Sequence, residues 1–207
     1  MARITDPAAL HRLCGAPSAG AREKVLHRLD AHCRAVLAQA RFCVIATAAA
    51  DGLCDAAPRG GPAGMAIALD DTRLMLPDYP GNRRFETLTN LIARPGIGLL
   101  FLVPGWAGAL RIRGTAEVRD DAELCDLYAA TAKRPPAVIV IAVREAYIQF
   151  GKAAERAGLW SGPAAGADHG LPQAADMIRD HVAAGEPAAR CVAAIDMAAS
   201  GKPGGDR

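Results

Sequence analysis

Aromatic residues and net charge are both scarce in this sequence. Its 207 residues include two tryptophans, three tyrosines and four phenylalanines, whereas 46 residues are alanines. The larger aliphatic residues are still numerous enough for one sizeable core, which excludes a wholly disordered chain. Basic residues exceed acidic ones by only 24 − 22 = 2. This balance gives no indication of a nucleic-acid partner or of an acidic membrane surface as a partner.

The chain also lacks a long apolar run and any cysteine pair with metal-binding spacing. Its longest uncharged apolar run, residues 97–110, is shorter than the ~20 residues of a membrane-spanning helix and contains Pro104. The N-terminal residues MARITDPAAL hold no apolar segment of the kind found in signal peptides. The six cysteines form no CxxC motif. We therefore expect a cytoplasmic protein with six reduced thiols, no bound metal and no membrane contact.

Motifs for self-contained catalysis are missing as well. The three serines lie outside any GxSxG motif, which argues against the nucleophile elbow of a hydrolase. There is no Walker A sequence, and the cluster of Gly60, Gly61 and Gly64 lacks the GxGxxG spacing of dinucleotide-binding loops. An enzyme with this inventory would most simply take its chemistry from a cofactor.

Strand patterns dominate residues 41–148. Short β-rich segments separated by turns are expected at residues 41–47, 53–57, 65–69, 74–76, 96–103, 110–119 and 138–148. Helices are expected at residues 7–13, 21–40, 83–93, 120–131, 152–157 and 171–184. This order favours a mainly β (α+β) protein, a closed or partly closed barrel with flanking helices, over a doubly wound parallel sheet. We assign residues 1–20 to an N-terminal arm, 21–185 to the barrel domain and 186–207 to a flexible C-terminal tail.

Arginines occupy two positions suited to an anion. Arg59 lies between a strand and a Gly-Pro turn, and the segment 82–84 (Asn82, Arg83 and Arg84) lies at the expected N-terminus of a helix. Helix N-termini present free N–H groups, and guanidinium groups donate paired hydrogen bonds to phosphate oxygens. These residues predict a phosphate site, with solvated surface arginines as the alternative.

The stretch that contains these arginines resembles a known family. The segments APRGGPAG, YPGNRRFETLTN and LFLVPGWAGALRIRG together resemble the pyridoxamine 5′-phosphate oxidase-like, FMN-binding split-barrel family, and the resemblance extends over residues 22–185. It implies a six-stranded split β-barrel with flanking helices. It also implies a homodimer with one FMN in each of two clefts between the subunits.

The resemblance assigns cofactor-binding residues to this chain. Arg59 matches an arginine on the strand under the flavin, and the segment 82–84 matches the one that grips the FMN phosphate. Arg111 and Arg113 lie on a later strand, where related proteins contact flavin or substrate. Arg111 fits the pattern of the similar family members, whereas Arg113 stands where that pattern usually has asparagine.

A further match lies near residue 150. Lys152, Arg156 and Trp160 fit the family pattern H-C-x-K-A…R-S-x-L-W, but Gln149 and Phe150 replace its His and Cys. Any role of that His or Cys therefore does not carry over to this chain. The resemblance suggests Lys152 and Trp160 as cofactor-binding residues, because a flat indole is suited to stacking on the flavin ring. Packing of Trp160 in the dimer interface is the alternative.

Taken together, these features predict an FMN-dependent oxidoreductase that acts on a small substrate. No residue stands out as a general acid or base, which fits flavin chemistry that depends mainly on orientation. Two alternatives stay open, a flavin-binding protein without turnover and a split barrel that holds haem or the deazaflavin F420. Pyridoxamine phosphate oxidase activity itself is disfavoured, because the C-terminal substrate-phosphate motif of that enzyme is missing.

Overall fold

The computed structural model describes residues 3–81, 84–129, 133–161 and 170–184. The chain divides into two units after Ser161. The first unit carries the sheet and most of the helices, and the described part of the second unit carries one helix, α7 (Ala174–Ala184). Within these described ranges, no helix is both long and apolar enough to cross a membrane.

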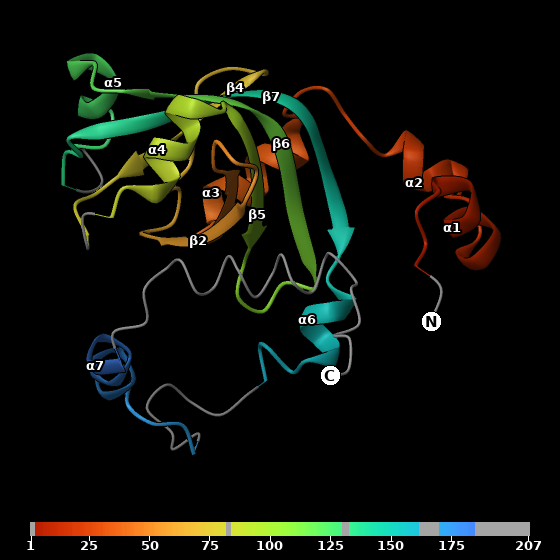
Figure 1. Cartoon of the computed structure of the whole chain (residues 1–207). Coiled ribbons are helices and arrows are strands. Elements are labelled where there is room, and N and C mark those ends of the chain that lie inside the picture. The colour runs from red at the N-terminus through yellow and green to blue at the C-terminus, as the bar shows by residue number, and fades with distance from the viewer. Residues whose placement is uncertain (1–2, 82–83, 130–132, 162–169, 185–207) are drawn as a thin grey trace, which may run out of the picture. The chain divides into compact units, whose positions relative to one another are not determined.

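One antiparallel sheet organises the first unit (Figure 1). Its strands are β1 (Phe42–Ala48), β2 (Cys54–Gly60), β3 (Ile67–Ala68), β4 (Arg73–Asp78), β5 (Gly96–Leu102), β6 (Gly108–Arg119) and β7 (Ala137–Phe150). Their spatial order is β2-β1-β5-β6-β7-β4-β3, and each neighbouring pair is antiparallel. The two ends of the sheet are therefore β2 on one side and the β3–β4 hairpin on the other.

The mainly β fold with flanking helices, of the split-barrel class, is confirmed. Among the described residues the sheet has seven strands, one more than the six that the family resemblance implies. The additional strand is the two-residue β3, which pairs with β4 across a tight turn. In that turn the Asp70 carboxylate accepts hydrogen bonds from the backbone N–H of Thr72 at 2.7 Å and from its hydroxyl at 2.9 Å. The turn folds Ile67 and Ala68 back onto the sheet.

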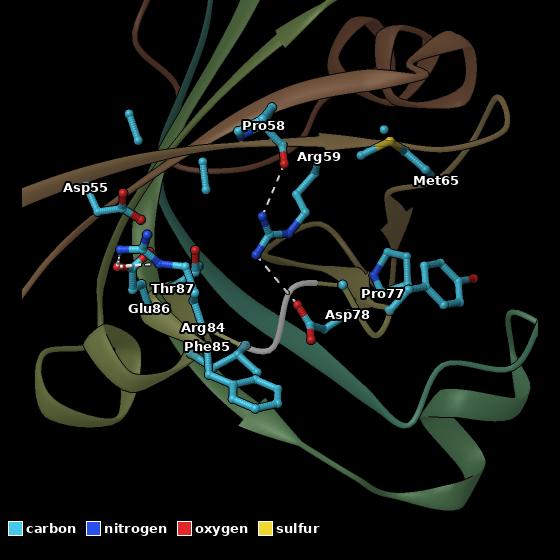
Figure 2. Close-up of a pocket in the computed structure, with 16 residues that line it drawn as sticks. Asp55, Pro58, Arg59, Met65, Pro77, Asp78, Arg84, Phe85, Glu86 and Thr87 are labelled. Atoms are coloured by element: carbon cyan, nitrogen blue, oxygen red, sulfur yellow. Dashed lines mark hydrogen bonds and ion pairs between the residues drawn. The ribbon is translucent and has the colours of Figure 1, made fainter. Parts of the chain in front are cut away.

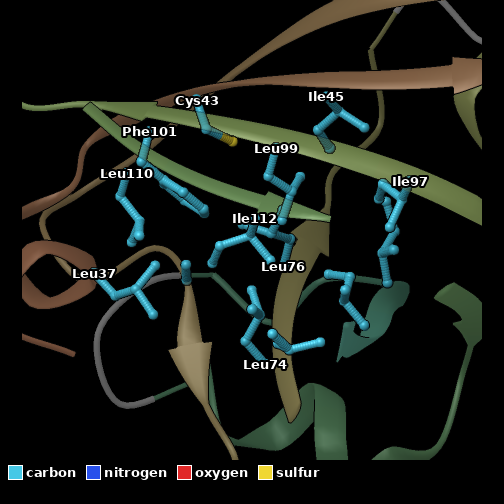
Figure 3. Close-up of a cluster of buried hydrophobic side chains, with 14 of the residues drawn as sticks. Leu37, Cys43, Ile45, Leu74, Leu76, Ile97, Leu99, Phe101, Leu110 and Ile112 are labelled. Atoms are coloured by element: carbon cyan, nitrogen blue, oxygen red, sulfur yellow. The ribbon is translucent and has the colours of Figure 1, made fainter. Parts of the chain in front are cut away.

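The core lies on the inward face of this sheet. Successive side chains of a strand point to opposite faces, so Leu110 and Ile112 of β6 are buried while Arg111 and Arg113 between them are exposed. Figure 3 shows the cluster that results, in which inward side chains of β1, β4, β5 and β6 meet Leu37 of helix α3 (Ala31–Gln39). Burial of this apolar surface is the main term that stabilises the fold.

The first unit contains six helices in its described residues, and one of them corrects the sequence expectation. They are α1 (Pro7–Cys14), α2 (Ala19–Glu23), α3, α4 (Glu86–Ala93), α5 (Ala122–Asp126) and α6 (Lys152–Arg156). The single helix expected over 21–40 is wrong, because Leu26 exchanges backbone hydrogen bonds of 2.9 and 2.8 Å with Ala146 of β7. Helix α3 then starts at Ala31, and its N-cap is Asp30, whose carboxylate accepts from the Cys33 N–H at 2.8 Å.

Candidate functional site

A cavity of about 500 Å³ lies between the two ends of the sheet. One wall is β2, from Asp55 to Gly60, and the opposite wall is the end of β4 with the residues that follow it, Pro77 to Tyr79. The first turn of α4 and the residues just before it, Arg84 to Leu88, form a third side, and Met65 and Gly81 also line the cavity (Figure 2). The volume falls in the range of about 300–1,000 Å³ that small-molecule sites usually occupy.

Arg59 projects from β2 into this cavity, and its guanidinium joins the two ends of the sheet (Figure 2). One terminal nitrogen, Nη2, lies 3.6 Å from the Oδ1 atom of Asp78, and the other, Nη1, donates to the Pro58 carbonyl at 3.1 Å. The side chains of Arg59 and Asp78 are only 27% and 15% exposed. A half-buried charge pair is screened less by water and salt than a surface pair, so this contact is electrostatically significant.

Arg84 lines the same cavity from the start of α4. Its Nε atom donates to the Glu86 carboxylate at 3.1 Å, and a terminal nitrogen of Arg84 makes a second, shorter contact with the same oxygen. The neighbouring carboxylate raises the pKa of Arg84, so this guanidinium is charged at every physiological pH. Both side chains are largely exposed, at 68% and 49%, and exposed ion pairs of this kind exchange partners at little cost.

Carboxylates stand beside both arginines. Asp78 and Glu86 pair with Arg59 and Arg84, and Asp55 also lines the cavity. Burial raises the pKa of Asp78, and the nearby positive charge of Arg59 opposes that rise. The described lining therefore has charges of both signs. Asn82 and Arg83, which the sequence places next to Arg84, lie outside the described residues.

Helix α4 is held in place by a buried polar contact. The Asn90 side-chain amide donates to the Thr47 hydroxyl of β1 at 3.0 Å. In the part of the chain that the structure describes, the buried polar residues are Thr47, Thr87 and Asn90, which belong to β1 or α4. Buried polar groups need such partners, so this hydrogen bond sets the position of α4 against the sheet. The first turn of α4 is thereby kept at the cavity.

The backbone just before α4 has an unusual conformation. Phe85 has φ 55° and ψ 17°, which is the left-handed region, and it is the N-cap of α4 without a side-chain capping bond. A bulky residue in this region costs on the order of 1–3 kcal/mol and persists where the surroundings enforce it, often at ligand sites. The helix thus begins at Glu86, so the start expected at residue 83 is wrong.

Tyr79 contributes a buried hydroxyl to the cavity region. Within the described ranges its hydroxyl is the only buried side-chain polar atom without a hydrogen-bond partner, and burial raises the pKa of Tyr79. The nearby Tyr128 hydroxyl lies 3.1 and 3.0 Å from the carbonyls of Met65 and Met75. An orphaned buried hydroxyl is uncommon, and this one belongs to a residue that lines the cavity.

Arg111 and Arg113 lie elsewhere, on the outward face of β6. The Nη1 atom of Arg111 is 3.4 Å from the Gln149 amide oxygen, and its guanidinium lies over the Tyr147 ring at 5.5 Å. Arg113 pairs with Glu145 of β7 at 3.1 Å. Neither arginine lines the cavity that holds Arg59 and Arg84.

Lys152 and Trp160 are also outside this cavity. Lys152 begins α6 and is exposed, and Trp160 follows that helix with 37% of its surface exposed. Phe150, at the end of β7, is 83% exposed. Eight residues are expected to bind a cofactor, and the structure brings two of them, Arg59 and Arg84, together at the cavity. Four others lie away from it within one chain, and the last two lie outside the described residues.

Sequence reasoning missed Asp78, Tyr79 and Phe85. The segment Pro77-Asp78-Tyr79-Pro80-Gly81 offers a signal, because a strand that ends in a Pro-Gly turn often carries site residues. That signal does not identify Asp78 as the residue that faces Arg59, because the strands that carry these two residues, β4 and β2, do not pair with each other.

The described residues offer few other reactive groups. They contain no group of three or more His, Cys, Asp or Glu side chains that could hold a metal ion. The five cysteines among them are free thiols. Burial raises the pKa of Cys33 to about 11 and that of Cys43 to about 12, so both are neutral thiols at physiological pH.

Several solved structures are similar to this chain at low sequence identity. HupZ of Group A Streptococcus is 21% identical, with 63% of this chain and 94% of that chain covered and a TM-score of 0.44. A putative pyridoxamine 5′-phosphate oxidase of Lactobacillus delbrueckii is 22% identical, with 59% and 95% covered and a TM-score of 0.47. An F420 reductase is 19% identical, with 56% and 94% covered and a TM-score of 0.38. No curated protein matches the chain.

A family model gives the decisive match. Residues 29–150 match the model described as pyridoxamine 5′-phosphate oxidase, and this range includes β1 to β7, α4 and the whole lining of the cavity. The match spans 122 of 207 residues, which is more than half of the sequence. The chain therefore belongs to the pyridoxamine 5′-phosphate oxidase family.

Proposed function

We propose that this chain binds FMN in the cavity between β2, the end of β4 and the start of α4, and that it is an FMN-dependent oxidoreductase. One observation carries the proposal. Arg59 and Arg84 are 25 positions apart in the sequence, yet both line one cavity of suitable volume. Two guanidinium groups at one end of a small-molecule cavity suit a phosphate group, and membership of the family supports a phosphorylated cofactor.

The cavity has both charged and apolar lining residues, which suit the two parts of FMN. Arg59 and Arg84 both line it, and the first turn of α4 adds backbone N–H groups that favour an anion. Apolar side chains of Met65, Pro77 and Leu88 line the remainder and suit a flat ring. The donor set and the shape therefore fit this cofactor.

The edge of the sheet adds hydrogen-bonding groups for the ring. β2 is a terminal strand and, within the described residues, its ladder partner is β1 alone. The backbone groups on the other side of a terminal strand are not used by the sheet. They can pair with the carbonyl and imide groups along the edge of a flavin.

In this proposal the chain binds and orients, and the cofactor supplies the redox chemistry. Arg59 and Arg84, together with Asn82 and Arg83, which precede Arg84 in the sequence, would hold the phosphate and orient the cofactor. When bound, FMN supplies transfer of electrons or of a hydride to a small substrate or to oxygen. Cys33 and Cys43 have no part as nucleophiles in that chemistry, because both are neutral thiols.

We further propose a homodimer with the cofactor at the subunit interface. Arg111, Arg113, Lys152 and Trp160 do not line the cavity of their own chain. Arg111 and Arg113 are exposed on the outward face of β6, and Lys152 and Trp160 lie beyond the end of β7. A second copy that presents these elements would bring them to the open side of the cavity. This arrangement makes all eight expected residues part of one site.

An absorption spectrum of the purified protein tests the proposed cofactor. We expect flavin bands and release of FMN on denaturation, whereas haem or F420 bands, or no bound chromophore together with no FMN binding, would contradict the proposal. Reduction of the bound flavin by NADH or NADPH in stopped-flow measurements then separates an oxidoreductase from a binder. Lack of reduction by every donor tested would favour the protein that binds flavin without turnover.

Substitution of the arginines tests the proposed phosphate contact. We expect Arg59→Ala, and separately the double change Arg83→Ala with Arg84→Ala, to weaken FMN binding by about 10- to 100-fold, because a hydrogen bond to a charged group contributes about 1.5–3 kcal/mol. FMN fluorescence quenching gives the dissociation constants. The control is Arg34→Ala, which removes an arginine that is paired with Asp71 and lies outside the cavity. Unchanged FMN binding in both arginine variants would refute the assignment.

A further inference from the structure

The carboxylate of Asp78 already lies beside the Arg59 guanidinium, one of the two cations proposed to bind the phosphate of the ligand. The Arg59 guanidinium comes from β2 and the Asp78 carboxylate from the end of β4, and they are 3.6 Å apart across the gap between the two ends of the sheet. Both side chains line the cavity (Figure 2). A phosphate that binds Arg59 must therefore share that guanidinium with Asp78 or displace Asp78 from it.

The surroundings of Asp78 do not favour a second negative charge. Its side chain is 15% exposed, so water screens it poorly. Its immediate cationic neighbour is Arg59, and the other charged groups that line the cavity among the described residues are Asp55 of β2 and the Arg84–Glu86 pair at α4. On β7 the residue opposite Asp78 is Ala137, and Cys43, opposite Arg59 on β1, is a neutral thiol. Among the groups just named, Arg59 is thus the cation that neutralises Asp78. A phosphate that took over Arg59 would leave the Asp78 carboxylate next to a second negative charge.

We propose that Asp78 competes with the phosphate of the ligand for Arg59, so that binding of FMN is coupled to uptake of one proton by the Asp78 carboxylate. This inference rests on the proposed function and adds a regulation of the same site. In the absence of ligand, Asp78 and Arg59 neutralise each other across the gap. In the complex the phosphate takes the place of the carboxylate at Arg59, and the carboxyl group is neutral because a proton from solvent binds to it.

The burial of Asp78 supports the direction of this coupling. Desolvation already raises the pKa of the Asp78 carboxyl while Arg59 still opposes that rise. A ligand that withdraws Arg59 and adds negative charge nearby acts in the same direction as desolvation. A fall in pH therefore favours the bound form on the protein side, and a rise in pH favours the free form with its internal ion pair.

A carboxylate-to-amide change measures the competition. We expect Asp78→Asn to bind FMN at least about 10-fold more tightly than the wild type at about pH 8, with the ratio of the two affinities approaching one at about pH 5. Protonation of the FMN phosphate affects binding to both proteins equally, so its effect drops out of this ratio. Riboflavin, which has no phosphate, should bind both proteins equally. The matched control is Asp71→Asn, the same change at an exposed aspartate that is paired with Arg34.

The outcomes separate the inference from the proposed function. Equal or weaker FMN binding by Asp78→Asn, while the wild type binds FMN, would overturn the competition and leave the cofactor assignment standing. An equal gain for riboflavin would also overturn it, because the phosphate would then play no part. If neither protein binds FMN at any pH, the proposed function fails and the inference fails with it.

A second measurement needs no variant. Calorimetric titration of the wild-type protein with FMN, in two buffers that differ in ionisation enthalpy, counts the protons exchanged on binding. At about pH 7.5 a phosphate monoester with a pKa of about 6 is mostly a dianion and contributes little. We expect net proton uptake at this pH. No uptake, or net release, contradicts the proposal.

Discussion

Strands β6 and β2 belong to one sheet, but they differ in what their residues do. β6 pairs with β5 on one side and β7 on the other, and its inward residues Leu110 and Ile112 are fully buried. β2 pairs with β1 at one end of the sheet, and each of its seven residues is exposed or half-buried. Yet β2 forms a whole wall of the cavity. A central strand stabilises this fold, whereas a terminal strand is free to contact a ligand.

The largest expected effect tests the stabilising part of this comparison. Leu110→Ala should lower the free energy of unfolding by about 2–5 kcal/mol, because it removes buried methyl groups and leaves a cavity in the core. Chemical denaturation monitored by circular dichroism measures the change. Cys54→Ala, at an exposed position of β2, should alter the free energy of unfolding by no more than about 0.5 kcal/mol. Similar losses in the two variants would remove the distinction between the strands.

A smaller effect tests how the cavity is joined to the stable part of the sheet. Asn90→Ala should cost about 1–3 kcal/mol, because it removes the partner of the buried Thr47 hydroxyl. Since this contact holds the first turn of α4 at the cavity, FMN binding should weaken as well. Thr89→Ala, at an exposed position of the same helix, provides the control. Loss of stability without any change in FMN affinity would show that α4 does not contribute to the site.

The sequence was sufficient to predict the central strands and to predict that Arg59 and Arg84 lie at one site. Alternation of Leu110 and Ile112 with Arg111 and Arg113 predicts one buried and one exposed face, and the structure confirms it. Arg59 and Arg84 were expected in one phosphate site, and both line one cavity. These features depend on local patterns and on a family resemblance, which a sequence displays directly.

The features that the sequence did not predict all depend on distant contacts. The break in the expected helix over 21–40 requires Leu26 to pair with Ala146, which lies 120 positions further along the chain. The contact of Asp78 with Arg59 arises only when the two ends of the sheet approach each other. The left-handed backbone of Phe85 contradicts its residue type and is set by the surrounding structure. Local periodicity contains none of this information.

The smallest expected effect contrasts two aspartates that flank β4. Asp70, in the β3–β4 turn, accepts hydrogen bonds from Thr72 and Arg73, and these contacts lower its pKa. Asp78, at the other end of the strand, has its pKa raised by burial. A lowered carboxyl pKa in the folded state stabilises the protein above the unfolded pKa, and the benefit disappears as pH falls. A raised pKa has the opposite sign, so the ionised Asp78 costs stability until acid neutralises it.

Thermal unfolding of the ligand-free protein between about pH 3 and pH 7 checks these signs. Asp70→Asn should lower the melting temperature slightly at about pH 7, and the difference from wild type should shrink as pH falls below the ordinary aspartate pKa of about 3.9. Asp78→Asn should raise the melting temperature at about pH 7, and its advantage should shrink as pH falls through the raised pKa. A loss of stability in Asp78→Asn at about pH 7 would mean that the ion pair with Arg59 outweighs the cost of burial. The ion pair between β2 and β4 would then stabilise the folded protein, as the contacts of Asp70 stabilise the β3–β4 turn. A cost in stability at the ligand site would be excluded.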